Sequence, residues 1–196
     1  DAQESRGLGD VYKRQNETSP ETVAVNFGQL LHPLGGDNGT LTSGAAFTKV
    51  TSGTYNNRFH STGFSWNEVG TISLLARVGD NNYLGTGAGA ELSSTPYTVG
   101  RFYPKHYTLA SSSFGNTCSD FSYMGQPAMK LEYELQAKNV AGAVTQNYRP
   151  GYGVLAAPSV VLENADNGTD LSGRTIVPAS SWTSGKYLSL IHISEP

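Results

Sequence analysis

Three observations predict an all-β fold made of antiparallel, immunoglobulin-like β-sandwich modules. Apolar and polar side chains alternate strictly from Met129 to Lys138, so a strand there would bury one face and expose the other. No stretch from Asn16 to Tyr187 has sustained helical periodicity. Extended runs recur with turn signals roughly every 8–12 residues, the spacing typical of β-sandwiches.

The two ends of the chain are expected to be foreign to the natural protein. Residues 5–15 read as the translation of a transposase-based sequencing adapter, and residues 188–196 as the translation of its complementary strand. Residues 1–4 fit the index region just upstream. We therefore expect residues 1–15 and 188–196 to be adapter-derived artefacts that flank natural sequence from Asn16 to Tyr187.

Within the natural part we expect two β-sandwich modules, the first over residues 16–100 and the second over residues 101–187. The first is expected to be truncated at its N-terminal side and the second at its C-terminal side. The boundary is placed near Val99–Lys105, because Pro104 lacks the amide hydrogen that a strand ladder needs and so marks an edge or a crossing.

The strongest strand signals in chain order are residues 64–78 and the central strand at 129–138. Gly125 and Pro127 precede the central strand, and we expect a bulge or a strand crossover there. Weaker signals mark further strands, which we expect at residues 22–27, 45–50, 83–86, 96–109 with a break at Pro104, 144–148, 159–163 and 175–177.

Charge and composition exclude some classes of function. The chain of 196 residues has a net charge of −3 and only 15% charged residues, which argues against a nucleic-acid-binding surface. No apolar run is long enough to span a membrane. Cys118 is the single cysteine, and it leaves the redox compartment undecided because a truncated chain can lack the disulfide partner.

Motifs that resemble catalytic sites are better interpreted as structure. Residues 85–89 are glycine-rich, but no helix follows to face a phosphate. Ser65 lies in a Gly-Phe-Ser-Trp-Asn run that lacks the second glycine of a nucleophile elbow, so we expect it to face solvent. Glu132 and Glu134 share one face, about 7 Å apart, within reach of paired-carboxylate chemistry. Lysines on the same face favour an exposed, charge-balanced surface instead.

Metal sites are also not indicated. His32, His60 and His106 are far apart in the sequence, so we expect surface histidines. Residues 166–170 (Asp-Asn-Gly-Thr-Asp) offer oxygen ligands, but an Asx-type turn is favoured and a weak calcium site is the alternative. We therefore assign no catalytic, cofactor-binding or metal-ligating residue and no cofactor.

Aromatic residues crowd a short region and have two interpretations. Exposed tyrosines could bind sugar rings or a partner protein, whereas buried ones would fill a core poor in leucine and isoleucine. We favour core filling for this set, which comprises Tyr97, Phe102, Tyr103, Tyr107, Phe114, Phe121 and Tyr123.

A resemblance to a known family is carried by a series of motifs. These are residues 99–107 (Val-Gly-Arg-Phe-Tyr-Pro-Lys-His-Tyr), Phe114, Cys118, residues 121–127 (Phe-Ser-Tyr-Met-Gly-Gln-Pro), 137–142 and 145–148. Together they resemble the large uncharacterised domain of MshQ-like proteins, which are encoded with the mannose-sensitive haemagglutinin (MSHA) type IV pilus of Gram-negative bacteria. Residues 66–76 resemble the β repeat that precedes this domain.

The resemblance implies an exported, multi-domain surface protein associated with pili, and it supplies no catalytic residues. We therefore expect a non-enzymatic fragment of a bacterial surface protein, extracellular or pilus-associated, that acts in type IV pilus biogenesis or cell adhesion. Its expected partners are pilus proteins, other cell-surface proteins or glycans, and not nucleic acid. The alternative is a carbohydrate-binding module or an accessory domain of a secreted glycoside-active protein.

Overall fold

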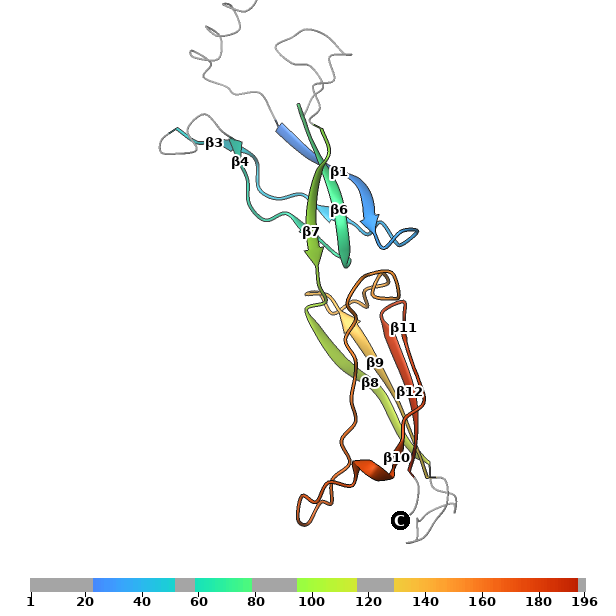
Figure 1. Cartoon of the computed structure of the whole chain (residues 1–196). Helices are drawn as coiled ribbons and strands as arrows, with labels where there is room; N and C mark the ends of the chain where they lie inside the picture. Colours follow the sequence, from blue (N-terminus) through green and yellow to red (C-terminus); the bar gives the residue numbers. More distant parts are fainter. Residues whose placement is uncertain (1–22, 52–58, 79–94, 116–128, 194–196) are drawn as a thin grey trace, which may run out of the picture. The chain divides into compact units, whose positions relative to one another are not determined.

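The chain is almost entirely β-structure in the computed structural model, which describes residues 23–51, 59–78, 95–115 and 129–193 (Figure 1). Besides strands, these residues contain one short 3-10 helix, η2 (Ser172–Arg174). The strands are β1 (Val23–His32), β2 (Leu41–Thr42), β3 (Thr48–Lys49), β4 (Phe59–His60), β5 (Ser65–Trp66), β6 (Gly70–Val78), β7 (Tyr97–Phe102), β8 (His106–Gly115), β9 (Met129–Lys138), β10 (Thr175–Ile176), β11 (Trp182–Thr183) and β12 (Lys186–Ile193).

The predicted all-β class is confirmed, and the antiparallel sheets are consistent with a β-sandwich. Within the described ranges, no helix reaches the length and apolarity that crossing a membrane requires.

The chain divides into two compact units, each gathered from separate segments. The described residues of the first unit are 23–28, 41–51, 59–66, 73–78 and 95–98. Those of the second unit are 29–40, 67–72, 99–115 and 129–193. The module limits expected for the natural protein, 16–100 and 101–187, stay predictions.

The first unit contains two short antiparallel strand pairs besides its parts of β1, β6 and β7. Strand β2 pairs with β5 through Leu41 opposite Trp66, and β3 pairs with β4 through Thr48 opposite His60. The Trp66 side chain is buried. Since each ladder has only two residue pairs, side-chain burial must contribute much of the stability here.

A three-stranded sheet with the order β1-β6-β7 contains the second strand signal of the sequence. Its middle strand is β6, in which Ile72 is fully buried and Ser73 nearly so. Gly70 begins this strand with a φ of 140°, and a Cβ at that position would collide with the carbonyl oxygen of His32. Only glycine fits there, because other residues disfavour this φ and the neighbouring backbone fills the space.

The predicted central strand is the middle of the sheet in the second unit. This sheet has the order β10-β12-β9-β8, with β11 attached to β12. Strand β9 pairs antiparallel with β12 from Met129 opposite Ile193 to Gln136 opposite Lys186. On its other side β9 pairs with β8, and a register shift between Leu109 and Ser111 interrupts that ladder. The prediction of a central, half-buried strand at residues 129–138 is therefore confirmed.

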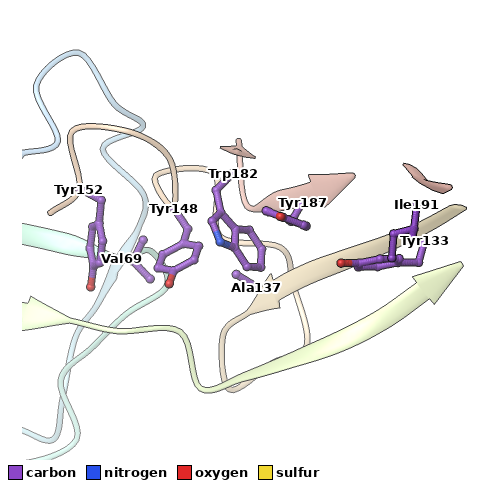
Figure 2. Close-up of a cluster of buried hydrophobic side chains, with 8 residues drawn as sticks. All are labelled: Val69, Tyr133, Ala137, Tyr148, Tyr152, Trp182, Tyr187 and Ile191. Carbon is purple, nitrogen blue, oxygen red and sulfur yellow. The ribbon is translucent and has the colours of Figure 1, made fainter. Parts of the chain in front are cut away.

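Aromatic side chains build the core of the second unit (Figure 2). Tyr148 lies between Tyr152 and Trp182, with ring centroids 5.3 Å and 4.9 Å away. The Trp182 ring in turn contacts Tyr187 at 5.5 Å. Aromatic rings each bury a large area and prefer such tilted or edge-on contacts, so this cluster contributes strongly to stability.

A tight hairpin places Trp182 and Tyr187 in this core. The loop between β11 and β12 is Ser184–Gly185, and both residues have positive φ, 47° and 77°. This is the pattern of a type I′ turn, whose twist matches that of the flanking strands. The Gly185 backbone donates to the Tyr148 carbonyl at 3.0 Å and accepts from Ala137 N–H at 2.8 Å.

Strand β12 extends into residues 188–193, for which an adapter origin is expected and no strand was predicted. Ile191 is fully buried, yet Ser189 is also buried, and its hydroxyl has no hydrogen-bond partner among the described residues. Leu188 is 66% exposed and lies opposite Glu134. Burying a serine while exposing a leucine is the reverse of favourable strand patterning, so backbone pairing with β9 and the burial of Ile191 hold this part of β12.

Two predicted strands are wrong. Residues 144–148 form a single bridge, Val144 with Lys138, before the chain turns. Residues 159–163 are irregular apart from a bridge between Glu163 and Asp170. The expected strand at 45–50 shrinks to β3, the break near Pro104 is confirmed, and the expected features at 83–86, Gly125 and Pro127 lie outside the described residues.

Candidate functional site

The carboxylates that resembled a catalytic pair lie on the solvated face of β9. Lys186 Nζ is 3.5 Å from Glu134 Oε1, and Gln136 Nε2 donates to the same oxygen at 2.7 Å. The Gln136 hydrogen bond, with a smaller contribution from Lys186, lowers the pKa of the Glu134 carboxyl. A general acid needs a raised pKa, so this arrangement favours the surface interpretation.

The other motifs are also placed as structure. Ser65 is exposed on β5, as predicted, and residues 85–89 lie outside the described part of the chain. His32, His60 and His106 are all exposed. Within the described ranges, no three His, Cys, Asp or Glu side chains come close enough together to hold a metal ion.

The loop at residues 164–172 is a series of Asx turns. Asn164 Oδ1 accepts from Asp166 N–H at 2.8 Å, and Asn167 Oδ1 accepts from Thr169 N–H at 3.0 Å. Asp170 Oδ1 accepts from Ser172 N–H at 2.8 Å, and the hydrogen bonds to Ser172 lower the pKa of the Asp170 carboxyl. The Asx-turn interpretation is confirmed, because these oxygens serve the backbone of the loop.

The crowded aromatics divide between surface and core. Tyr97, Tyr103 and Phe114 are 75%, 68% and 51% exposed, so core filling is wrong for these three residues. Tyr107 is half-exposed but joins the core cluster, with its ring 5.5 Å from that of Trp182. Phe121 and Tyr123 lie outside the described residues. The aromatic part of the core is instead formed by Tyr133 of β9 and by aromatic residues that follow β9 in the chain, whose burial depends on tertiary packing.

A buried carboxylate, Glu68, is the most unusual polar group of the second unit. Its Oε1 accepts from Gln146 N–H at 2.8 Å, and its Oε2 accepts from Asn147 N–H and Val69 N–H, each at 3.2 Å. Desolvation by burial raises the pKa of this carboxyl, and the three backbone donors oppose the rise. The hydrogen bonds to residues 146 and 147 span 78 and 79 positions of sequence.

Asn147 continues the network from the buried carboxylate to a loop. The side chain of Asn147 is completely buried. Its Oδ1 accepts from Asp37 N–H, and its Nδ2 donates to the Asp37 carbonyl, both at 2.7 Å. The amide thereby pairs with the backbone of residue 37 as a neighbouring strand would. We call Glu68, Asn147 and Asp37 the polar hub.

Further hydrogen bonds connect the same segments at the surface of the second unit. Arg149 donates to the Gly35 carbonyl at 3.0 Å, and Asn139 Nδ2 donates to the Asn67 carbonyl at 2.8 Å. The polar hub and these contacts join three segments, residues 33–40, 67–69 and 139–149, that lie far apart in the sequence.

The hydroxyl groups of the aromatic core are also bonded. Tyr148 OH accepts from Ala156 N–H at 2.7 Å and lies 2.8 Å from Tyr107 OH. Trp182 Nε1 donates to the Ala156 carbonyl at 2.7 Å. Burial, with a contribution from Tyr148, raises the pKa of Tyr107, and burial raises that of Tyr152 to about 12. These phenols stay protonated at neutral pH, so they act as hydrogen-bonding groups rather than as bases.

Sequence reasoning did not identify Glu68 or Asn147. The local signal was weak, because Glu68 follows Asn67 in the strand signal of residues 64–78 and does not stand out from the other polar residues of that run. A carboxylate in such a run must find hydrogen-bond donors when it is buried. The chemistry of the polar hub is structural, since its carboxylate oxygens are directed at backbone donors.

This protein is therefore an all-β protein, and its second unit is organised around an aromatic core and the polar hub. Residues 68–191 match the model of the DUF6701 family, third domain, and the chain belongs to that family. The match begins at the hub glutamate and ends at Ile191 in β12. Comparison with curated proteins and with solved structures found no match.

Proposed function

We propose that this chain is a non-enzymatic part of an exported bacterial surface protein that serves the biogenesis or adhesion of MSHA-type pili. Membership of the DUF6701 family carries the proposal, together with the residue-level resemblance of residues 64–148 to MshQ-like proteins. The matched region and the region of resemblance overlap from residue 68 to residue 148.

The proposed role is mechanical and adhesive. Strand β9 is hydrogen-bonded along its length to β8 on one side and to β12 on the other, so pulling on it would shear two ladders at once. The polar hub adds long-range bonds between segments that extension would otherwise separate. These features support a unit that keeps its shape under load while loops and edges contact other proteins.

The test is the genomic neighbourhood of the complete gene combined with a binding measurement. We expect genes for pilins and a pilus ATPase beside it, and we expect the purified chain to cosediment with MSHA-type pili. Pili of an unrelated class serve as the control. A gene without pilus genes nearby, whose product binds neither kind of pilus, would contradict the proposal.

A carbohydrate-binding module is the second candidate. Its support is the exposure of Tyr97 and Tyr103, because exposed tyrosines can stack on sugar rings. Glycan-array binding that is lost in Tyr97→Ala or Tyr103→Ala, but kept in Phe59→Ala, would favour this candidate. No binding to any glycan would remove it.

A further inference from the structure

The outer edge of β8 is a candidate for an interface. Strand β8 ends the sheet of the second unit, and among the described strands only β9 pairs with it. All its residues except Thr108 are exposed. An edge strand of this length presents unpaired backbone donors and acceptors, and another strand can pair with them.

Strand β8 has few of the features that normally keep an edge strand from pairing with another strand. The strand has no Lys, Arg, Asp, Glu or Pro from His106 to Gly115. The irregularity between Leu109 and Ser111 lies toward one end and leaves Ser111 to Gly115 in regular register with β9. Two copies of this edge could therefore approach without repulsion between like charges.

The register of β8 makes the edge complementary to itself. Ser112 lies opposite Tyr133 of β9, whereas Leu109 lies opposite Leu135 and Phe114 opposite Leu131. The partners in β9, Leu135 and Leu131, are each two positions from Tyr133. Leu109 and Phe114 therefore lie at equal distances on either side of Ser112, and all three share one face of the sheet. Both apolar side chains are exposed, by 59% and 51%.

We propose that β8 is a homodimer interface, in which two copies of the chain pair antiparallel about a twofold axis at Ser112. Ala110 is the extra residue of the register shift and has no partner in β9. With Ala110 left out of the pairing, this axis places Ser111 of each copy opposite Ser113 of the other, and Leu109 opposite Phe114. The two sheets then form one continuous sheet, and both exposed apolar side chains gain an apolar neighbour. A twofold interface requires such self-complementarity.

The dimer is expected to be weak and reversible. A single pair of strands gives an interface below the standard size of protein–protein contacts, so we expect a dissociation constant on the order of 10–100 µM. Sedimentation equilibrium of the full chain, from well below to well above this range, measures it. A chain that stays monomeric throughout overturns the proposal.

Cysteine cross-linking tests the position of the twofold axis. In a Cys118→Ser background, Ser112→Cys places two thiols opposite each other, close enough for a disulfide. We expect it to form covalent dimers at least tenfold faster than Ser159→Cys, an exposed control that is not part of β8. Equal rates for the two variants overturn the proposal.

The register between the two β8 strands is tested by measuring the dimer dissociation constant of variants with charge substitutions. The double variant S111K/S113K brings lysine opposite lysine twice, and we expect dimerisation to weaken at least tenfold. The variant S111E/S113K brings opposite charges together twice and should dimerise at least as well as the unmodified chain. Thermal unfolding of each monomer controls for effects on folding. Equal weakening of the dimer in both variants would refute the register.

Discussion

Replacing Glu68 by alanine tests whether the polar hub holds the second unit together. The substitution removes the acceptor of two long-range donors, Gln146 N–H and Asn147 N–H, and of the neighbouring Val69 N–H, while these backbone groups keep their places in the fold. A buried donor without a partner costs about 1–3 kcal/mol. Residue 147 is buried and residue 146 is exposed. We therefore take the upper part of this range for the Asn147 N–H and the lower part for the Gln146 N–H.

The expected loss of unfolding free energy for Glu68→Ala, summed over these two long-range donors, is therefore about 4 kcal/mol. Glu68→Gln keeps one acceptor oxygen but turns an NH₂ group toward the second donor, so we expect an intermediate loss of about 1–2 kcal/mol. Glu132→Ala is the matched control, because this glutamate is exposed on β9 and should change stability by less than about 0.5 kcal/mol.

Urea denaturation at pH 7, followed by tryptophan fluorescence, measures these differences because Trp182 lies in the core of the same unit. The order of stability should be Glu132→Ala equal to the unmodified chain, then Glu68→Gln, then Glu68→Ala. If Glu68→Ala unfolds within about 0.5 kcal/mol of the unmodified chain, solvent satisfies the two donors and the structural role of the polar hub is wrong.

The raised pKa of Glu68 adds a pH dependence. The folded state holds the proton more tightly than the unfolded state, whose carboxyl titrates near its ordinary value of 4.5. The contribution of this group is therefore fully present below pH 4.5 and is lost as pH rises through the folded-state pKa. We expect the stability of the unmodified chain relative to Glu68→Gln to fall over this window. An increase over the same window would reverse the assigned sign.

Three further predictions concern single positions in the second unit, each read as a change in urea midpoint. Ser189→Ala should stabilise by about 1 kcal/mol, because it removes a buried hydroxyl that has no partner among the described residues; destabilisation would mean that the hydroxyl is bonded. Tyr148→Phe should cost about 1–2 kcal/mol, because it removes the acceptor of Ala156 N–H; an unchanged midpoint would contradict this role. Gly185→Ala should cost more than about 2 kcal/mol, because φ is positive there and the new Cβ would meet the Thr145 carbonyl; a neutral result would contradict the turn geometry.

The sequence was most informative where one local pattern determines the structure. Alternation from Met129 to Lys138 predicted the strand, its two faces and its central place, and Pro104 predicted the break between β7 and β8. The prediction failed at residues 159–163, where a run with strand propensity forms only one bridge, between Glu163 and Asp170. It also missed β12, in which Ser189 is buried between the core residues Tyr187 and Ile191 while the backbone pairs along β9.

The candidate site was the least predictable part. Glu132 and Glu134 attracted attention because they are close in sequence, yet the structure leaves them on a solvated face. The carboxylate with a raised pKa is Glu68, whose main partners are almost eighty positions away. No local spacing indicates such a pairing, since it depends on which loops the folded chain brings together.

The sequence by itself therefore determined the all-β class and the identity of the central strand. A strand's alternation follows from backbone geometry, which acts over a few residues and leaves a visible period of two. Tertiary structure alone decided which tyrosines fill the core and how Asn147 pairs with the backbone of residue 37, across 110 positions. It also decided that Leu109 and Phe114 flank Ser112 symmetrically, because the register shift in β8 is defined only by pairing with β9.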